Sequence, residues 1–216
     1  MAQIVPAILE ETKEGFVDKV SRITKLPGVE RIQVDFADGI FVPHKLLVVN
    51  EIDALNPAFH WEAHLMVEDP QDFLDYNICG FKTILVHFEA YKKLSGLKKA
   101  IQAIKALNIE PGVCLQTETQ IDVVKDLLDE VKHFSLMGIE KPGYQGMPFL
   151  ETTYKKITEL RTIAPRAIIE IDGGVNFDDA KQLAQVGADL LIAGSVLTKA
   201  DNLPEAWDKL QILIMS

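Results

Sequence analysis

Short apolar runs alternate with longer amphipathic, charge-bearing segments along the whole 216-residue chain. Apolar runs of four to seven residues are typical of strands buried on both faces of a parallel sheet. They predict strands at residues 3–9, 31–36, 61–66, 83–88, 112–115, 134–137, 169–172 and within 190–195. The segments between them predict helices at residues 11–25, 46–55, 70–79, 93–107, 120–130, 150–163, 176–186 and 204–213. In the third helix, Asp69 is the expected cap, Pro70 the first residue and Gly80 the C-terminal stop.

Eight strand–helix units with short connections favour a parallel sheet that closes on itself. We therefore expect a single (β/α)8 TIM barrel formed by one domain over residues 1–216, because no linker or low-complexity segment divides the chain. An open doubly wound sheet is the alternative, but it would need fewer units. The chain length is ordinary for one barrel with a large core.

Composition excludes several functional classes. The net charge of −10 argues against a nucleic-acid surface. No apolar run approaches the roughly 18 residues that cross a membrane, and the first residues do not resemble a signal peptide. Cys79 and Cys114 are far apart in apolar surroundings, which predicts reduced thiols and a cytoplasmic protein.

Two apolar runs end in glycine-containing turns that precede helices. The first turn contains Asp172, Gly173 and Gly174, and the second contains Gly194 and Ser195. Free backbone N–H groups at such turns bind phosphate without a basic side chain. A tight strand–helix turn with an acidic cap would give the same pattern, but its repetition favours a phosphate site at the mouth of the barrel.

Polar residues also stand where other predicted strands end. Asp35 closes the second strand, and Gln33, two residues earlier, shares its face. His64 lies on the third strand, and His87 and Glu89 close the fourth. A single histidine is more often a satisfied core residue. Several polar groups converging on one mouth can instead hold a divalent metal and supply an acid and a base. Asp38 is interpreted as a loop cap.

Seven short motifs, in order along nearly the whole chain, resemble the ribulose-phosphate 3-epimerase family of the ribulose-phosphate-binding barrels. They are PAIL at residues 6–9, VDFADGIFVP at 34–43, AHLM at 63–66, VHFEA at 86–90, PGYQG at 142–146, IDGG at 171–174 and AGS at 193–195. The combination is specific, although each motif alone is not.

The resemblance implies an isomerase that inverts C3 of a ketopentose 5-phosphate through an enediolate. Asp35 and Asp172 would be the two proton-transferring aspartates. Asp35, His64 and Asp172, with Gln33 as a possible fourth ligand, would hold Zn²⁺, Fe²⁺, Mn²⁺ or Co²⁺, which stabilises the enediolate. The implied phosphate-binding residues are Gly143, Gly146, Gly173, Gly174, Gly194 and Ser195, and the implied substrate contacts are Ala7, Met66 and Met137. The implied partners are a small sugar phosphate and further copies of the chain.

The chain departs from the family pattern around the reaction centre. Gln33 replaces a metal-ligand histidine, Ala37 replaces a methionine over the substrate, and Ala7 replaces a serine. In the loop after the sixth strand, Lys141 and Gln145 replace asparagine and glycine. An amide oxygen is a poor substitute for imidazole on Zn²⁺, so we expect weak metal binding or none.

Three functions therefore stay open. The first is epimerisation of D-ribulose 5-phosphate to D-xylulose 5-phosphate. The second is a related barrel reaction on another sugar phosphate, although residues 62–66 lack the lysine of the decarboxylating relatives' D-x-K-x-x-D motif. The third is a sugar-phosphate binder without turnover, which the loss of the histidine at position 33 favours and the presence of Asp35 and Asp172 opposes.

Overall fold

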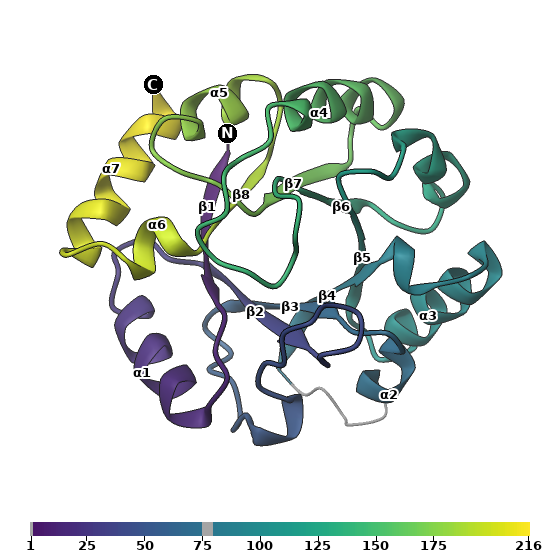
Figure 1. Ribbon diagram of the computed structural model, residues 1–216, viewed down its shortest axis with the longest axis horizontal. Coiled ribbons are helices and arrows are strands. Elements are labelled where there is room, and N and C mark those ends of the chain that lie inside the picture. The colour runs from purple at the N-terminus through teal and green to yellow at the C-terminus, as the bar shows by residue number, and fades with distance from the viewer. Residues whose placement is uncertain (1, 75–79) are drawn as a thin grey trace.

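The computed structural model describes residues 2–74 and 80–216 and is a closed barrel of eight parallel strands. The strands follow one another around the barrel in chain order, and the last pairs with the first. Figure 1 looks into the barrel, with the helices arranged outside the ring of strands. This confirms the predicted (β/α)8 fold. The strands are β1 Gln3–Ile8, β2 Arg31–Ala37, β3 His60–Met66, β4 Phe81–His87, β5 Glu110–Leu115, β6 His133–Met137, β7 Ile168–Asp172 and β8 Leu190–Ala193.

Seven α-helices and three short 3-10 helices connect these strands in the described part of the chain. The α-helices are α1 Lys13–Ile23, α2 Pro70–Leu74, α3 Leu94–Ala106, α4 Thr152–Ile163, α5 Ala180–Gln185, α6 Ser195–Thr198 and α7 Leu203–Met215. The 3-10 helices are η1 Val49–Glu51, η2 Phe88–Ala90 and η3 Ile121–Leu127. Asp69 accepts a hydrogen bond from the backbone N–H of Gln71, as expected of a cap. The predicted end of α2 at Cys79 falls outside the described residues.

Three predicted helices were wrong in type or length. Residues 46–55 contain only η1, because Leu46 and Leu47 donate backbone hydrogen bonds to Ala37 and Glu10 instead of forming a helical turn. Residues 120–130 form the 3-10 helix η3, whose buried residues Ile121, Val124 and Leu127 recur every third position. Residues 176–186 contain the shorter α5, because the segment first makes a turn around the side chain of Asn176.

Successive strand residues point alternately to the outside and the inside of the barrel. The outward side chains pack against the helices and form the main apolar core. Part of the inner wall is apolar, where Val5, Ala7, Leu190 and Ile192 of β1 and β8 form a small cluster. The inward residues of β2, β3, β6 and β7 include charged and polar side chains that are buried. A polar interior is unusual for a barrel of this kind, where bulky branched residues dominate.

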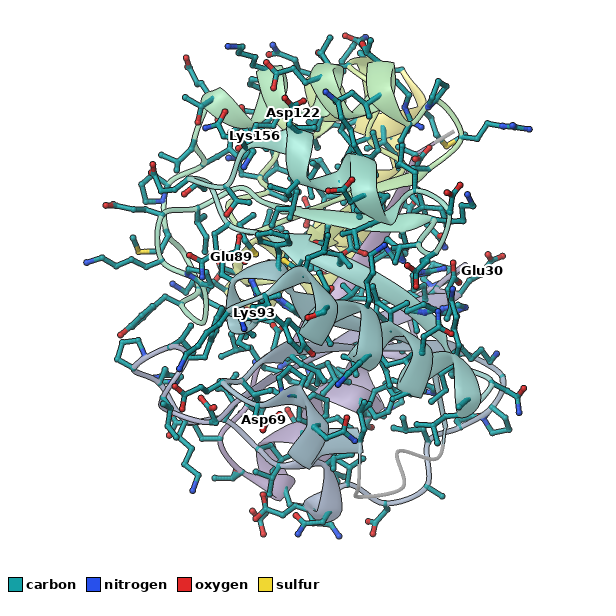
Figure 2. The ribbon with its side chains drawn as sticks, turned by 90° about the vertical axis from the view of Figure 1, so that its right-hand side faces the viewer. Glu30, Asp69, Glu89, Lys93, Asp122 and Lys156 are labelled. Atoms are coloured by element: carbon teal, nitrogen blue, oxygen red, sulfur yellow. The ribbon has the colours of Figure 1, made fainter. Side chains whose placement is uncertain are left out.

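The strands run from one end of the barrel to the other, so their carboxyl ends share one face. Figure 2 shows the molecule from the side, with Glu89, after β4, on the left and Glu30, before β2, on the right. The left side is therefore the mouth at which functional residues of such barrels gather. No helix among the described residues is long and apolar enough to cross a membrane.

Candidate active site

Two carboxylates and an imidazole meet at the carboxyl ends of β2, β3 and β7. Nδ1 of His64 donates a hydrogen bond to Oδ1 of Asp35 over 2.9 Å and lies 2.9 Å from Oδ2 of Asp172. Asp35 pairs with His64 in the register of β2 and β3, which places them side by side. Asp172 ends β7 on the far side of the barrel. The imidazole therefore bridges the two predicted catalytic aspartates.

Gln33 joins the same two carboxylates from below. Its Nε2 donates to Oδ1 of Asp35 over 3.0 Å and to Oδ2 of Asp172 over 2.9 Å. Its Oε1 is buried and has no hydrogen-bond partner among the described residues. The amide nitrogen, and not the oxygen, thus faces the reaction centre and neutralises part of the repulsion between the aspartates.

A chain of polar contacts continues from His64 along the inner wall. Nε2 of His64 lies 2.9 Å from Nε2 of His87, and Nδ1 of His87 lies 3.3 Å from Oε2 of Glu89. Because the carboxylate of Glu89 only accepts, His87 donates from Nδ1 and accepts from His64 at Nε2. His64 then donates from both nitrogens, so it is an imidazolium in this arrangement. Cys114 is a free, buried cysteine at the same level of the barrel, as predicted, and Cys79 lies outside the described residues.

His64, Asp35 and Asp172 have different surroundings, which shift their pKa values in different directions. Burial alone would lower the pKa of His64, but its hydrogen bonds to Asp172 and Asp35 raise that pKa well above its ordinary value. Burial raises the pKa of Asp35. Burial would also raise the pKa of Asp172, but the hydrogen bond and charge of His64 hold it below the usual range. Two carboxyl groups whose pKa values are pushed apart are suited to acid and base roles.

The glycines predicted to bind phosphate line the same mouth. Gly173 and Gly174 follow Asp172 directly, and both have positive φ values, 95° and 75°. A Cβ on Gly174 would lie 2.7 Å from the backbone of Phe149, so only glycine allows this close approach. Gly194 and Ser195 lead from β8 into α6. The turn after β7 is held by Asn176, whose Oδ1 accepts hydrogen bonds from the backbone N–H groups of Asp178 and Asp179.

The segment between β6 and α4 crosses the barrel opening in Figure 1. Its ends are tied together, because the backbone N–H of Leu150 donates to the carbonyl of Gly138 over 2.8 Å. Its tip contacts the end of α6 and the loop after β2. The hydroxyl of Thr198 donates to Oε1 of Gln145 over 3.2 Å, and the ring of Tyr144 lies 5.8 Å from that of His44. The tip therefore covers the mouth.

All the predicted site residues except Gln33 line one cavity at the mouth of the barrel. The cavity brings together the three charged groups, the six predicted phosphate-binding residues, and Ala7, Met66 and Met137. Gln33 lies beneath, fully buried. As predicted, Asp38 caps its own loop by accepting hydrogen bonds from the backbone N–H groups of Ile40 and Phe41.

Sequence reasoning missed several residues of this cavity. Leu9, Ile139, Val175 and Ile192 contribute apolar walls, and neighbouring motifs gave no reason to single them out. It also missed Lys199, whose Nζ lies 2.7 Å from the position that a Cβ on Gly146 would occupy. A cation this close to the predicted phosphate end had a signal in the sequence, because Lys199 comes only four residues after Ser195.

The residues present fit a divalent metal ion with three ligands. Asp35, His64 and Asp172 each offer one donor atom, and these atoms lie within 4.8 Å of one another. Two carboxylates and one imidazole are suitable donors for Zn²⁺, Mn²⁺ or Fe²⁺. Gln33 would add its oxygen only after turning its amide, which its unpartnered Oε1 leaves possible.

Comparison with known proteins identifies the family of the chain. The sequence profile of the ribulose-phosphate 3-epimerase family matches residues 3–198. The chain belongs to the ribulose-phosphate 3-epimerase family. It is 30% identical over 205 residues to the ribulose-phosphate 3-epimerase of Bacillus subtilis (strain 168), which covers 91% of this chain and 92% of that protein. It is 31% identical over 210 residues to the chloroplastic ribulose-5-phosphate-3-epimerase of Arabidopsis thaliana, covering 94% and 74%.

Solved structures of two enzymes with low sequence identity share the fold of this epimerase-family chain. The 3-hexulose-6-phosphate synthase of Salmonella typhimurium superimposes with a TM-score of 0.74 at 18% identity, over 99% of this chain and 98% of that one. The 3-keto-L-gulonate-6-phosphate decarboxylase of Vibrio cholerae gives a TM-score of 0.76 at 16% identity, over 99% and 97%. At such low identity these similarities concern the fold alone.

Proposed function

We propose that this member of the family is a ribulose-phosphate 3-epimerase that interconverts D-ribulose 5-phosphate and D-xylulose 5-phosphate. The observation that carries the proposal is the pair Asp35 and Asp172, which lie near the carboxyl ends of β2 and β7 and meet over His64 and Gln33. Inversion at one carbon requires a proton to leave one face and another to arrive on the opposite face, so it needs two such groups.

Asp172, Asp35 and His64 would have separate roles in the reaction. In one direction, the carboxylate of Asp172 removes the C3 proton and Asp35 delivers a proton to the other face. In the reverse direction the two exchange roles. His64, positively charged and 2.9 Å from both carboxylates, stabilises the negative charge that passes between them. A divalent ion held by Asp35, His64 and Asp172 would supply Lewis-acid stabilisation of the enediolate oxygens.

The glycine turns fix the other end of the substrate. Gly173, Gly174, Gly194 and Ser195 line the cavity beside the carboxylates and would hold the phosphate through backbone N–H groups. Gly143 and Gly146 lie on the loop that covers the mouth, and Ala7, Met66 and Met137 would contact the carbon chain. Exclusion of water by this loop would protect the reactive enediolate.

Solvent-deuterium incorporation at C3 of ribulose 5-phosphate tests the proposal, with the purified protein before and after metal removal. Exchange that requires metal supports the epimerase with three protein ligands. Exchange without metal supports the same reaction with His64 and Gln33 as the stabilising groups. Absence of exchange under every metal tried, together with tight binding of the sugar phosphate, overturns the proposal. That outcome favours another sugar phosphate or a binder without turnover.

The same proposal places the enzyme in the cytoplasm as a homo-oligomer that acts on a small sugar phosphate. The free, buried Cys114 supports the compartment, and the family supports the homo-oligomer and the substrate class. Light scattering after size-exclusion chromatography tests the oligomeric state, and a monomer at micromolar concentration would contradict it.

A further inference from the structure

A second cluster of two carboxylates and one histidine lies inside the barrel, one layer below the active centre. Glu62 belongs to β3, His133 to β6 and Glu170 to β7, and all three side chains are fully buried. Glu62 and Glu170 stand two residues before His64 and Asp172, so each shares the inward face of its strand with an active-site residue. Donor atoms, one from each of the three residues, lie within 4.8 Å of one another.

The histidine stands between the two carboxylates. Its Nε2 donates a hydrogen bond to Oε2 of Glu170 over 3.1 Å. Its Nδ1 lies 3.7 Å from Oε2 of Glu62, too far for a hydrogen bond. Nδ1 thus faces a carboxylate without sharing a proton with it.

Three polar atoms of the cluster have no hydrogen-bond partner among the described residues. They are Oε1 of Glu62, Oε1 of Glu170 and Nδ1 of His133. A buried polar atom left without a partner is costly, and a buried charge is more so. The cluster therefore has an unused ligand atom on each of its three members.

One positive side chain, Arg31, balances the two carboxylates only in part. Its Nη1 donates to Oε2 of Glu62 over 2.8 Å. Arg31 also lines a hollow at the end of the barrel opposite the mouth, together with Gln3, Ile168 and Leu190. The side chain of Arg31 therefore stands between the cluster and this hollow.

We propose that Glu62, His133 and Glu170 bind a divalent transition-metal ion through one oxygen of each carboxylate and Nδ1 of the imidazole. Carboxylate and imidazole together suit Zn²⁺, Mn²⁺ and Fe²⁺. The hydrogen bond from Nε2 of His133 to Glu170 fixes the ring with Nδ1 free, as in metal sites where a ligand histidine donates its other N–H to a carboxylate.

The charge of the cluster points in the same direction. Glu62 and Glu170 are both fully buried, and among the described residues only Glu62 is paired with an arginine or lysine, Arg31. One arginine therefore does not balance the charge of both carboxylates. A divalent ion supplies the missing positive charge, and the competing occupant is a proton held by one of the two carboxyl groups.

This second site shares no ligand with the active centre. Its bound ion would brace β3, β6 and β7 from within and place a positive charge beneath Asp172. The role is structural, so its test does not depend on turnover and is separate from the test of the proposed epimerase activity.

Zinc is the probe. Protein freed of metal with a chelator is crystallised and soaked in millimolar zinc, and diffraction is measured on both sides of the zinc absorption edge. We expect an anomalous peak among Glu62, His133 and Glu170. The double variant E62Q/E170Q, which keeps the side-chain volumes, should lose that peak and one zinc equivalent per chain after dialysis. The variant H64A removes a ligand of the active centre only, so it should retain the lower peak.

Absence of a peak in the lower cluster of the wild-type protein would overturn the proposal and leave a proton as the occupant. Retention of the full zinc content by E62Q/E170Q would also overturn it. The wild-type diffraction measurement decides the matter even when the double variant does not fold.

Discussion

The barrel holds two clusters with the same donor set but different surroundings. In the upper cluster, Asp35 and Asp172 are each bonded by Gln33 and His64, and they remain 6% and 9% exposed in the cavity. In the lower cluster, Glu62 and Glu170 are fully buried, and each retains an unpartnered oxygen. The same types of side chain are therefore compatible with two different roles, proton transfer and cation binding. Access to substrate suits the upper cluster for proton transfer, and enclosure suits the lower one for permanent binding of a cation.

The largest expected contrast is catalytic. Asp172→Asn should lower C3 exchange by about 10³-fold, because an amide can neither take nor give the proton. Phosphate binding should persist, since backbone groups of the glycine turns would provide it. Isothermal titration with inorganic phosphate and the deuterium assay measure the two separately. The matched variant Glu170→Gln, two residues earlier on β7, should keep most of the exchange. Equal losses in both variants would remove the functional distinction between the clusters.

The next contrast concerns stability. In metal-free protein, Arg31→Met should lower the free energy of unfolding by about 3–5 kcal/mol, because it leaves Glu62 buried without its positive partner. Urea unfolding followed by circular dichroism measures the change. Arg166, exposed on the same hollow, provides the control. Arg166→Met should change stability by less than about 0.5 kcal/mol. A similar effect of both substitutions would contradict the assigned role of Arg31.

The two clusters should also differ in how pH affects stability. The folded protein holds a proton on Glu170 up to a pKa of about 7, whereas an unfolded chain releases it near 4.5. The contribution of this group is therefore complete below pH 4.5 and is lost as pH rises through 7, by about 3 kcal/mol in metal-free protein. Urea unfolding at several pH values, compared with Glu170→Gln, isolates it. Parallel curves for the two proteins would rule the shift out.

The smallest expected effect is on zinc affinity and tests the role of the Gln33 amide. Gln33→His restores the imidazole of the family pattern and should tighten zinc binding at the active centre by about 10- to 100-fold. Competition with a chromogenic chelator measures the affinity. The anomalous peak in the lower cluster should not change. Unaltered affinity at the upper site would mean that Gln33 already serves as a ligand through its oxygen.

Sequence reasoning placed the strands and the mouth correctly because both depend on local patterns. Runs of apolar residues predict buried strands, and the polar residue that ends each run must lie at the carboxyl-terminal face. Asp35, His64 and Asp172 could be found in this way. The 3-10 helix within residues 120–130 could not be predicted. Over seven residues, apolar side chains spaced every three positions in a 3-10 helix cannot be told from those spaced every three to four positions in an α-helix.

The lower cluster escaped prediction for a different reason. Glu62, His133 and Glu170 lie within or beside apolar runs, and only the register of the strands shows that they face inward at one level. The direction of the Gln33 amide is likewise set by Asp35 on its own strand and by Asp172 on β7, which lies 139 residues further along the chain. Such contacts are properties of the closed barrel and not of any local segment.

The tied ends of the loop between β6 and α4 have a consequence for engineering. The hydrogen bond between Leu150 and Gly138 fixes the gap that this segment must bridge, independently of the residues in between. Shorter or longer loops can thus replace this segment without moving the strands of the barrel. Libraries built at residues 140–148, which leave Ile139 and Phe149 against the glycine turn, would vary the roof over the cavity while the carboxylates keep their positions. Substrate range and scaffold stability could then be evolved separately.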